Sequence, residues 1–372
     1  MQLAAIPLAL ALLLTTVSAQ EPRQPLPAPA KNPLISKIAL GSCSHQEHPQ
    51  PILHTIVADK PDLFVYLGDN IYGDTRDMAQ LRAHYGRLAA RPEFDALRKS
   101  VPLLATWDDH DYGWNDAGKE YPFKAESKEI FLNFWREPAD TDRRKRPGIY
   151  THYNFSDEKS GRNLQLILLD TRTFRDSLTR GRLSSWKNDY IPNPDPGKTL
   201  LGEAQWAWLK ERFKEPADLR IVATSIQLCH QHNGWESWTN LPSELYKMID
   251  LIKETRAEGV VFISGDVHWG ELSVLKIKGG YPLHDLTASG LNRTWDTVEP
   301  NQNRAGGDAE VYRKHHYGVI EIDWEAEVPE VTFHIKDLDG FTQIEKTIPL
   351  SDLSYPKPTL PAEPKTPEPA EN

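Results

Sequence analysis

Residues 63–72 read Leu-Phe-Val-Tyr-Leu-Gly-Asp-Asn-Ile-Tyr, an apolar run that gives way at once to a polar cluster. A short run of apolar, aromatic and β-branched residues is typical of a strand that is buried on both faces. Ligands of open α/β sheets bind just beyond the C-terminal ends of the strands. This stretch therefore predicts a buried strand whose end carries part of a binding site.

Similar apolar runs recur on both sides of this stretch. Together they predict strands at residues 37–40, 63–67, 101–106, 164–169, 220–225 and 260–264. Helices are predicted between them, at residues 51–58, 78–88, 123–135, 203–213 and 243–256. After residue 265 the sequence favours strands without long helices, at residues 271–277, 285–288, 318–323 and 330–337. The alternation implies layered α/β architecture, with a pair of central sheets flanked by helices.

The two ends of the chain differ from the middle. An apolar run from Leu3 to Val17, followed by Ser18-Ala19, predicts a signal peptide over residues 1–19 and a secreted, periplasmic or extracellular protein. No Lys or Arg precedes the run, so a retained N-terminal anchor is the alternative. The run is short for a membrane span, which needs about 20 residues. We expect a Pro-rich linker at residues 20–34, one large domain at 35–350 and a Pro-rich disordered tail at 351–372.

The charge and the cysteines narrow the possible functions. A net charge of −10 argues against a nucleic-acid-binding surface, which would need a basic patch. The two cysteines, Cys43 and Cys229, could form one disulfide in an oxidising compartment. Alternatively Cys43 binds a metal as a thiolate. We favour the thiolate, because a chain of this length does not need a disulfide to hold its core.

Nearly every predicted strand of the first part is followed by a cluster of polar residues. The clusters are Gly41-Ser42-Cys43-Ser44-His45, Gly68-Asp69-Asn70-Ile71-Tyr72, Trp107-Asp108-Asp109-His110-Asp111, Asp170-Thr171-Arg172, Gln227-Leu228-Cys229-His230 and Gly265-Asp266-Val267-His268. A single Asp or Asn after a strand is more often a turn former. Six clusters that include His and Cys favour one shared site. Carboxylate, phenolate, thiolate and imidazole groups bind hard to borderline cations, so two or three ions could share this set.

Five of the motifs, in this order, resemble those of the alkaline phosphatase D (PhoD-like) family of metallophosphoesterases. They are Gly-Ser-Cys at 41–43, Leu-Gly-Asp-Asn-Ile-Tyr at 67–72, Thr-Trp-Asp-Asp-His-Asp at 106–111, Leu-Asp-Thr-Arg at 169–172 and Ser-Gly-Asp-Val-His at 264–268. The resemblance covers roughly residues 35–350, which would form the catalytic domain. It implies a four-layer α/β/β/α sandwich of metallophosphatase type. It also implies hydrolysis of phosphomonoesters or phosphodiesters with a ferric ion, Fe(3+), and calcium ions, Ca(2+), as cofactors.

The resemblance assigns a role to each motif. Cys43 and Tyr72 would bind iron, and Asp69 would bridge iron to a second ion. The other metal ligands would be Asp109, Asp266 and His268. His110 would face the phosphate, where a protonated imidazole can act as a general acid or stabilise charge. Two cations about 3.5–4 Å apart can activate a water and hold the phosphoryl oxygens during in-line attack.

Several further residues have two readings each. Asp108 is a metal ligand or a partner of one, and Asn115 or Asp116 could bind calcium. Arg172 could grip a phosphate oxygen through a bidentate contact. Its alternative is a structural ion pair with a nearby carboxylate. The loop at residues 233–238, Asn-Gly-Trp-Glu-Ser-Trp, either grips substrate rings or packs on the core.

The leading hypothesis is an exported phosphoesterase that acts on small phosphate esters at neutral to alkaline pH. A rival is a secreted binding protein that keeps a structural metal site without turnover. A second rival is a phospholipase or nuclease that uses the same metal centre, although the negative charge disfavours long nucleic acids. The sequence leaves open monoester against diester preference and the oligomeric state.

Overall fold

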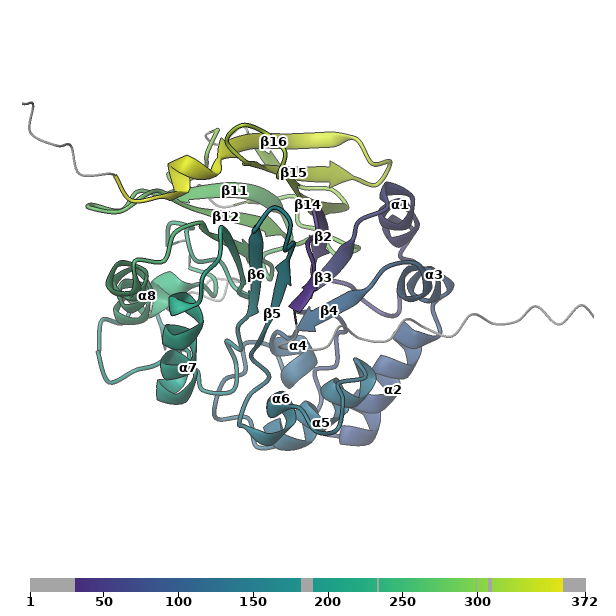
Figure 1. The fold of residues 1–372 in the computed structure, drawn as a ribbon. Coiled ribbons are helices and arrows are strands. Elements are labelled where there is room, and N and C mark those ends of the chain that lie inside the picture. The colour runs from purple at the N-terminus through teal and green to yellow at the C-terminus, as the bar shows by residue number, and fades with distance from the viewer. Residues whose placement is uncertain (1–30, 182–189, 233, 299, 307–309, 357–372) are drawn as a thin grey trace, which may run out of the picture.

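The computed structural model describes residues 31–181, 190–232, 234–298, 300–306 and 310–356. Two large β-sheets lie face to face, and helices cover their outer faces (Figure 1). The expected four-layer α/β/β/α sandwich is therefore confirmed. The predicted signal peptide, most of the predicted linker and most of the predicted tail lie outside the described residues.

One sheet has six strands in the order β16-β15-β14-β2-β3-β4. Its strands are β2 (Lys37–Gly41), β3 (Leu63–Leu67), β4 (Leu103–Thr106), β14 (His316–Asp323), β15 (Glu330–Asp337) and β16 (Thr342–Pro349). The neighbours β2, β3 and β4 run parallel. The remaining strands form an antiparallel meander that joins β2 through β14. The C-terminal ends of β2, β3 and β4 therefore lie at one edge.

The other sheet has eight strands in the order β1-β5-β6-β9-β10-β12-β11-β13. Its strands are β1 (Lys31–Pro33), β5 (Thr151–Ser156), β6 (Asn163–Leu168), β9 (Leu219–Ala223), β10 (Val260–Ser264), β11 (Gly270–Leu275), β12 (Leu283–Ala288) and β13 (Val311–Tyr312). The neighbours β6, β9 and β10 run parallel. A separate pair of short antiparallel strands consists of β7 (Thr179–Arg180) and β8 (Tyr190–Ile191).

The helices fall into two groups. Those that pack on the six-stranded sheet are α1 (Ile52–Asp59), α2 (Met78–Ala89), α3 (Pro92–Ser100) and α5 (Lys124–Phe134). Those that pack on the eight-stranded sheet are α7 (Gly202–Lys214) and α8 (Pro242–Thr255). Short helical turns are α4 (Asp109–Tyr112), α6 (Asp142–Lys145), η1 (Trp238–Asn240) and η2 (Leu350–Leu353).

Strand β3 shows why its sequence is continuously apolar. Leu63, Val65 and Leu67 belong to the core shared with the eight-stranded sheet. Phe64 and Tyr66 belong to the core beneath α1, α2, α3 and α5. A strand that is covered on both faces loses the alternation of polar and apolar residues. All five side chains are fully buried.

The predicted strands and long helices all occur, with boundaries that shift by at most two residues in the parallel strands. Prediction missed α3, β5 and β16, together with the short strands β1, β7, β8 and β13. Only two residues of β16 are buried, because it is an edge strand, so its apolar signal is weak. The domain boundaries also differ: Lys31–Pro33 pair with β5 instead of ending a linker, and Leu353 and Tyr355 are buried at the start of the expected tail.

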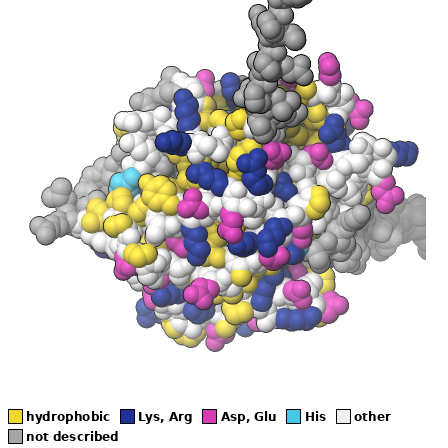
Figure 2. Space-filling model, turned by 60° about the vertical axis from the view of Figure 1, so that its left-hand side comes forward, with side chains coloured by type: hydrophobic (Ala, Val, Ile, Leu, Met, Phe, Trp, Pro, Cys, Tyr) yellow, Lys and Arg dark blue, Asp and Glu magenta, His cyan; other side chains and the backbone are white. Residues whose placement is uncertain are grey.

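Two observations concern the charge of the surface and the apolar character of the helices. On the face shown in Figure 2, Lys and Arg side chains are interspersed with Asp and Glu side chains. Among the residues that the structure describes, none of the helices is both long enough and apolar enough to span a membrane.

The connection from α8 to β10 passes close to the backbone that precedes β9, and a glycine substitution tests this close approach. Gly259 has a φ of +69°, and a Cβ atom there would lie 2.3 Å from the carbonyl oxygen of Asp218. We expect Gly259→Ala to lower the free energy of unfolding by about 1–3 kcal/mol. An alanine is strained at this φ, and its Cβ would clash with backbone atoms of Asp218. The control is Gly86→Ala in α2, where a Cβ would meet nothing within 4 Å. It should raise the free energy of unfolding by about 0.5–1 kcal/mol, since Gly is unfavourable in a helix. Urea denaturation measures both, and equal effects would contradict this path.

Candidate metal centre

The two sets of parallel strands end at one pocket. It is lined by residues that follow β3, β4 and β10, together with residues of two loops. The lining residues are Asp69, Asp109, His110, Asn115, Asp116, Trp235, Glu236, Asp266, Val267, His268, Trp269 and Trp295. Of the six predicted clusters, five meet at or directly behind this pocket. The exception contains Gln227, which bonds to Glu271 and Thr287 in the protein interior.

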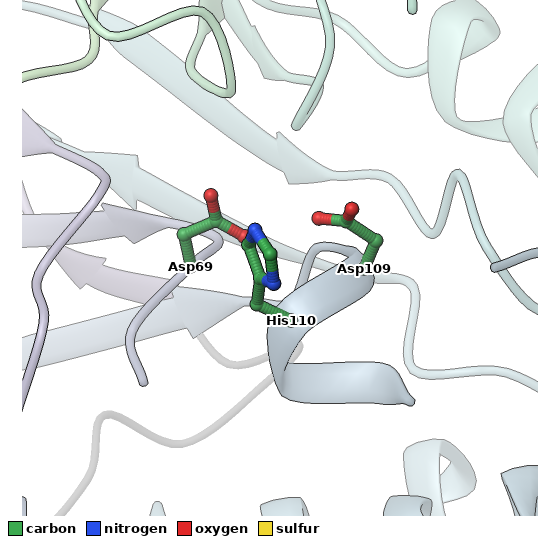
Figure 3. A group of neighbouring side chains, drawn as sticks. All are labelled: Asp69, Asp109 and His110. Atoms are coloured by element: carbon green, nitrogen blue, oxygen red, sulfur yellow. The ribbon is translucent and has the colours of Figure 1, made fainter. Parts of the chain in front are cut away.

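Three groups of side chains in the pocket have ligand atoms within 4.8 Å of one another. They are Asp69 with Asp109 and His110, Asp108 with Asp109 and Asp266, and Asp109 with Asp116 and Glu236. Asp109 belongs to all three groups and so stands at the centre of the cluster. Figure 3 shows the carboxylates of Asp69 and Asp109 facing one another with the His110 ring beside them.

Several buried carboxylate oxygens lack a hydrogen-bond partner within the described part of the chain. They are Oδ1 of Asp69, Oδ2 of Asp108 and Oδ1 of Asp109. An unsatisfied buried polar group costs about 1–3 kcal/mol, and a charged group costs more. Hard cations are bound by carboxylate oxygens of this kind. The donor set therefore fits metal ions.

The carboxylates also repel one another. Burial, the neighbouring Cys43 thiol and the other carboxylates raise the pKa of Asp69 well above its usual range. Burial and Asp108 do the same to the pKa of Asp266. Burial also raises the pKa of Asp109, but His110 and Arg172 outweigh it and hold that pKa below the usual range. Cations at the site would favour the charged form of all three.

Cys43 and Tyr72 both approach Asp69. The Cys43 Sγ atom lies 3.4 Å and the Tyr72 hydroxyl 3.5 Å from Oδ2 of Asp69. Burial raises the pKa of the Cys43 thiol, but His268 and hydrogen bonds from Ser289 and Ser42 bring it down to about 6. A thiolate, a phenol and a carboxylate thus converge on one point, and their assignment to iron stays a prediction.

The structure excludes the disulfide alternative. Both cysteines are free and buried. Cys229 lies in the larger hydrophobic core, where its thiol faces the carbonyl oxygen of Leu283 at 3.6 Å.

His110 lies in the first turn of α4. Its Nδ1 atom is 2.7 Å from a carboxylate oxygen of Asp74. Burial lowers the pKa of His110, but Asp109 and Asp74 outweigh it and raise the pKa to about 9. The imidazolium is therefore the main form at neutral pH. The other ring nitrogen remains for a phosphate or a metal, so the predicted phosphate-facing role stays a prediction.

Arg172 is fully buried behind the pocket. Its Nε donates to Asp108, and its guanidinium donates to Glu236 over 2.5 Å. Arg175 lies 3.0 Å from the other carboxylate oxygen of Glu236. The geometry is that of the structural ion pair and differs from the predicted bidentate phosphate grip, because carboxylates occupy Nε and one terminal nitrogen of the guanidinium, while the other terminal nitrogen lies 4.0 Å from Asp109.

Backbone strain is concentrated at this pocket. Six of the nine non-glycine residues with positive φ among the described residues lie in or beside it: Cys43, Asp69, Asp74, Asp116, Asp266 and His268. Such conformations persist only where the surrounding structure enforces them, and they cluster at functional sites. Gly68, with a φ of +105°, lets β3 end against β4, since a Cβ there would lie 2.5 Å from Cβ of Asp108.

The PhoD-like phosphatase family model matches residues 38–291. The chain belongs to the PhoD-like phosphatase family. The matched range contains all five motifs and every metal-ligand candidate.

Known relatives agree with this assignment. Alkaline phosphatase D of Bacillus subtilis (strain 168) is 26% identical over an alignment of 288 positions that covers 65% of this chain and 47% of the relative. The chain thus spans about half the length of that curated relative. Solved structures of lower identity share the fold. A structure of PhoD has a TM-score of 0.65 at 18% identity, covering 91% of this chain and 74% of the other.

Two more distant structures also share the fold. GAP50, the anchor in the inner membrane complex of Plasmodium, has a TM-score of 0.53 at 14% identity and covers 87% of this chain and 89% of its own. A dimetal phosphatase from Danio rerio has a TM-score of 0.51 at 14% identity and covers 85% of this chain and 99% of its own.

Three residues for which the sequence left two roles open have defined surroundings in the structure. Asp108 accepts hydrogen bonds from Arg172 and from Ser225, the latter at 2.6 Å, through Oδ1 and keeps Oδ2 free of hydrogen bonds. It can therefore be both a partner of the site and a ligand. Asp116 accepts a 2.6 Å hydrogen bond from Tyr190 and belongs to one of the three groups. Asn115 lines the pocket but belongs to none of these groups.

Sequence reasoning missed Glu236 as a ligand candidate. The residue is buried, and it reaches the cluster from a long loop after β9 rather than directly from a strand end. The only available signal was a carboxylate between two tryptophans. Trp238 packs in the core and donates to Thr224 at 2.9 Å, so the packing alternative holds for it. Trp235 lines the pocket instead.

Replacing Arg172 separates the two roles considered for it. We expect Arg172→Ala to lower the free energy of unfolding by about 3–5 kcal/mol, because Asp108 and Glu236 would remain buried without their partner. The control is Arg293→Ala, which removes an exposed guanidinium 5.4 Å from the Tyr72 ring and should change stability by at most about 1 kcal/mol. Denaturant unfolding measures both. Unchanged stability of Arg172→Ala with lost activity would point to the phosphate grip.

Proposed function

We propose that this protein is an exported metal-dependent phosphoesterase that hydrolyses small phosphomonoesters, phosphodiesters or both. The observation that carries the proposal is the convergence of buried carboxylates with unsatisfied oxygens on Asp109 in one pocket. Membership of the PhoD-like phosphatase family supports the same reaction class.

The ligand sets divide by chemistry. Cys43 and Tyr72, which both approach Asp69, form a set of anionic, electron-donating ligands that favours a trivalent ion, and we assign it to a ferric ion. Groups made only of carboxylates suit calcium. These are Asp108 with Asp109 and Asp266, and Asp109 with Asp116 and Glu236. When bound, the ions would supply Lewis-acid activation of water and neutralise charge on the phosphoryl oxygens.

The protein side chains hold the substrate and move its protons. Asp74 holds Nδ1 of His110, so that Nε2 remains to donate a proton to a phosphoryl oxygen or to the leaving oxygen. Asp109 keeps the adjacent imidazolium charged. Arg172 acts behind the pocket by positioning Asp108 and Glu236.

Export forms part of the proposal and rests on the sequence of residues 1–19. These residues lie outside the described part of the chain. The N-terminal residue of the protein recovered from the medium or periplasm tests it. A chain that still begins at Met1 there would favour the retained anchor.

Metal removal tests the reaction class. A strong chelator should abolish hydrolysis of p-nitrophenyl phosphate and of its bis-ester. Asp109→Asn should lower kcat/KM by about 100-fold or more, since it disturbs all three ligand groups. The control is Asp250→Asn on the exposed face of α8, which should leave kcat/KM unchanged. Activity that survives complete metal removal would leave this proposal untenable and would point to another hydrolytic chemistry.

Iron is tested independently of turnover. Elemental analysis should find iron and calcium in the purified protein, and a Tyr72-to-iron bond should give a visible absorption band. Tyr72→Phe should lose that band, because the phenolate donor is gone, while the Cys43 thiolate would contribute only a separate band of its own. The control is Tyr85→Phe, a buried Tyr that bonds Asp111 and should keep the band. Zinc alone, or a colourless protein, would overturn the assignment of the Cys43 and Tyr72 set.

A further inference from the structure

Two tryptophans form a corner in the wall of the metal pocket. Trp235 and Trp295 both line the pocket, and both are only partly buried. Their ring centroids are 5.2 Å apart, and their planes meet at 82°. A flat ring that lies in this corner can stack on one indole and meet the other edge to face, the two arrangements that aromatic pairs prefer.

The corner is continuous with the metal centre. Trp295 stacks on the His268 ring at 5.7 Å and 21°, and His268 lies 6.5 Å from the Tyr72 ring at 26°. The backbone N–H of Trp295 donates to the carbonyl oxygen of His268 at 3.1 Å. An aromatic surface therefore leads from the ligand candidates outward to Trp295 and then to Trp235.

The other side of the corner is also held in place. Glu236, next to Trp235 in the chain, accepts a hydrogen bond from Arg172 over 2.5 Å and lies 3.0 Å from Arg175. Ordered indoles at the edge of a polar pocket bind a ring with little loss of conformational entropy. Pockets of this kind use apolar walls for affinity and a few polar groups for orientation.

We propose that the leaving group of the substrate carries a flat aromatic or heteroaromatic ring, which Trp235 and Trp295 hold while the phosphate lies at the metal centre. This inference rests on the proposed function. A nucleoside monophosphate has the required form, with a phosphate at one end, a ring at the other and a sugar between them.

The test uses two substrates with the same scissile bond. Adenosine 5′-monophosphate and ribose 5-phosphate both release a primary sugar hydroxyl and differ by the adenine ring. We expect kcat/KM for the nucleotide to exceed that for the sugar phosphate by about tenfold or more, as single base–aromatic stacks give effects of this size. Trp235→Ala and Trp295→Ala should each reduce this ratio severalfold. Trp295→Phe, which keeps a ring, should restore most of it.

Trp208→Ala is the matched control. Trp208 is also partly buried and packs 4.8 Å from the Tyr150 ring, but it lies in α7 outside the metal pocket. The ratio should stay unchanged in this variant. A ratio near one in the unaltered protein would overturn the inference. A high ratio that both alanine variants preserve would also overturn it, because the ring would then bind elsewhere.

Binding distinguishes this inference from the proposed function. Titration calorimetry with the purified protein compares the two compounds without requiring turnover, with tighter binding of the nucleotide expected. If p-nitrophenyl phosphate, its bis-ester, ribose 5-phosphate and the nucleotide are all left intact, the proposed function fails. The ring inference then stands or falls on whether the nucleotide binds about tenfold more tightly in a manner that depends on Trp295.

Discussion

The burial of many carboxylates in one pocket is the constraint on which the rest of the structure depends. Six carboxylates gather there, and two buried guanidinium groups stand behind them. The carboxylates are Asp69, Asp108, Asp109, Asp116, Glu236 and Asp266. Arg172 pairs with Asp108 and Glu236, so its charge is already used within the protein. Burial, together with the remaining negative charge, raises the pKa of Asp69 and Asp266. Positive charge from bound ions is the most direct way to balance it.

This concentration of charge follows from the topology. Parallel strands present all their C-terminal ends at one edge, and two facing sheets bring two such edges together. The backbone must then turn within one or two residues of each strand end, and Asp69 and Asp266 have positive φ at two of these turns. A non-glycine residue pays for this conformation in strain. The cores on both faces of β3 are large enough to hold the turns in place.

The sequence was sufficient to predict the features that recur in this topology, namely the buried parallel strands and the polar motifs at their ends. Buried parallel strands are continuously apolar, and the side chains that follow them appear as motifs such as Gly-Asp-Asn and Gly-Asp-Val-His. It was insufficient where partners come from distant segments. Arg172 can grip a phosphate or pair with a carboxylate, and only its burial beside Asp108 distinguishes the two. Glu236 arrives from a loop without periodicity, and β16 has too few buried residues to stand out. Edge strands and loop ligands are specified by tertiary contacts rather than by local pattern.

The loop after β9 links metal binding to substrate recognition. Glu236 belongs to a candidate ligand group and is anchored by Arg172, while the preceding Trp235 faces the pocket. Arg172 in turn holds Asp108 at the end of β4. A displacement of this loop would therefore change both the carboxylate spacing and the aromatic wall. A substitution of Trp235 that changes the leaving-group preference would therefore have to keep Glu236 in its position. Trp295 contributes no ligand itself, but its ring stacks on the candidate ligand His268, so a change there would have to keep the His268 ring in place.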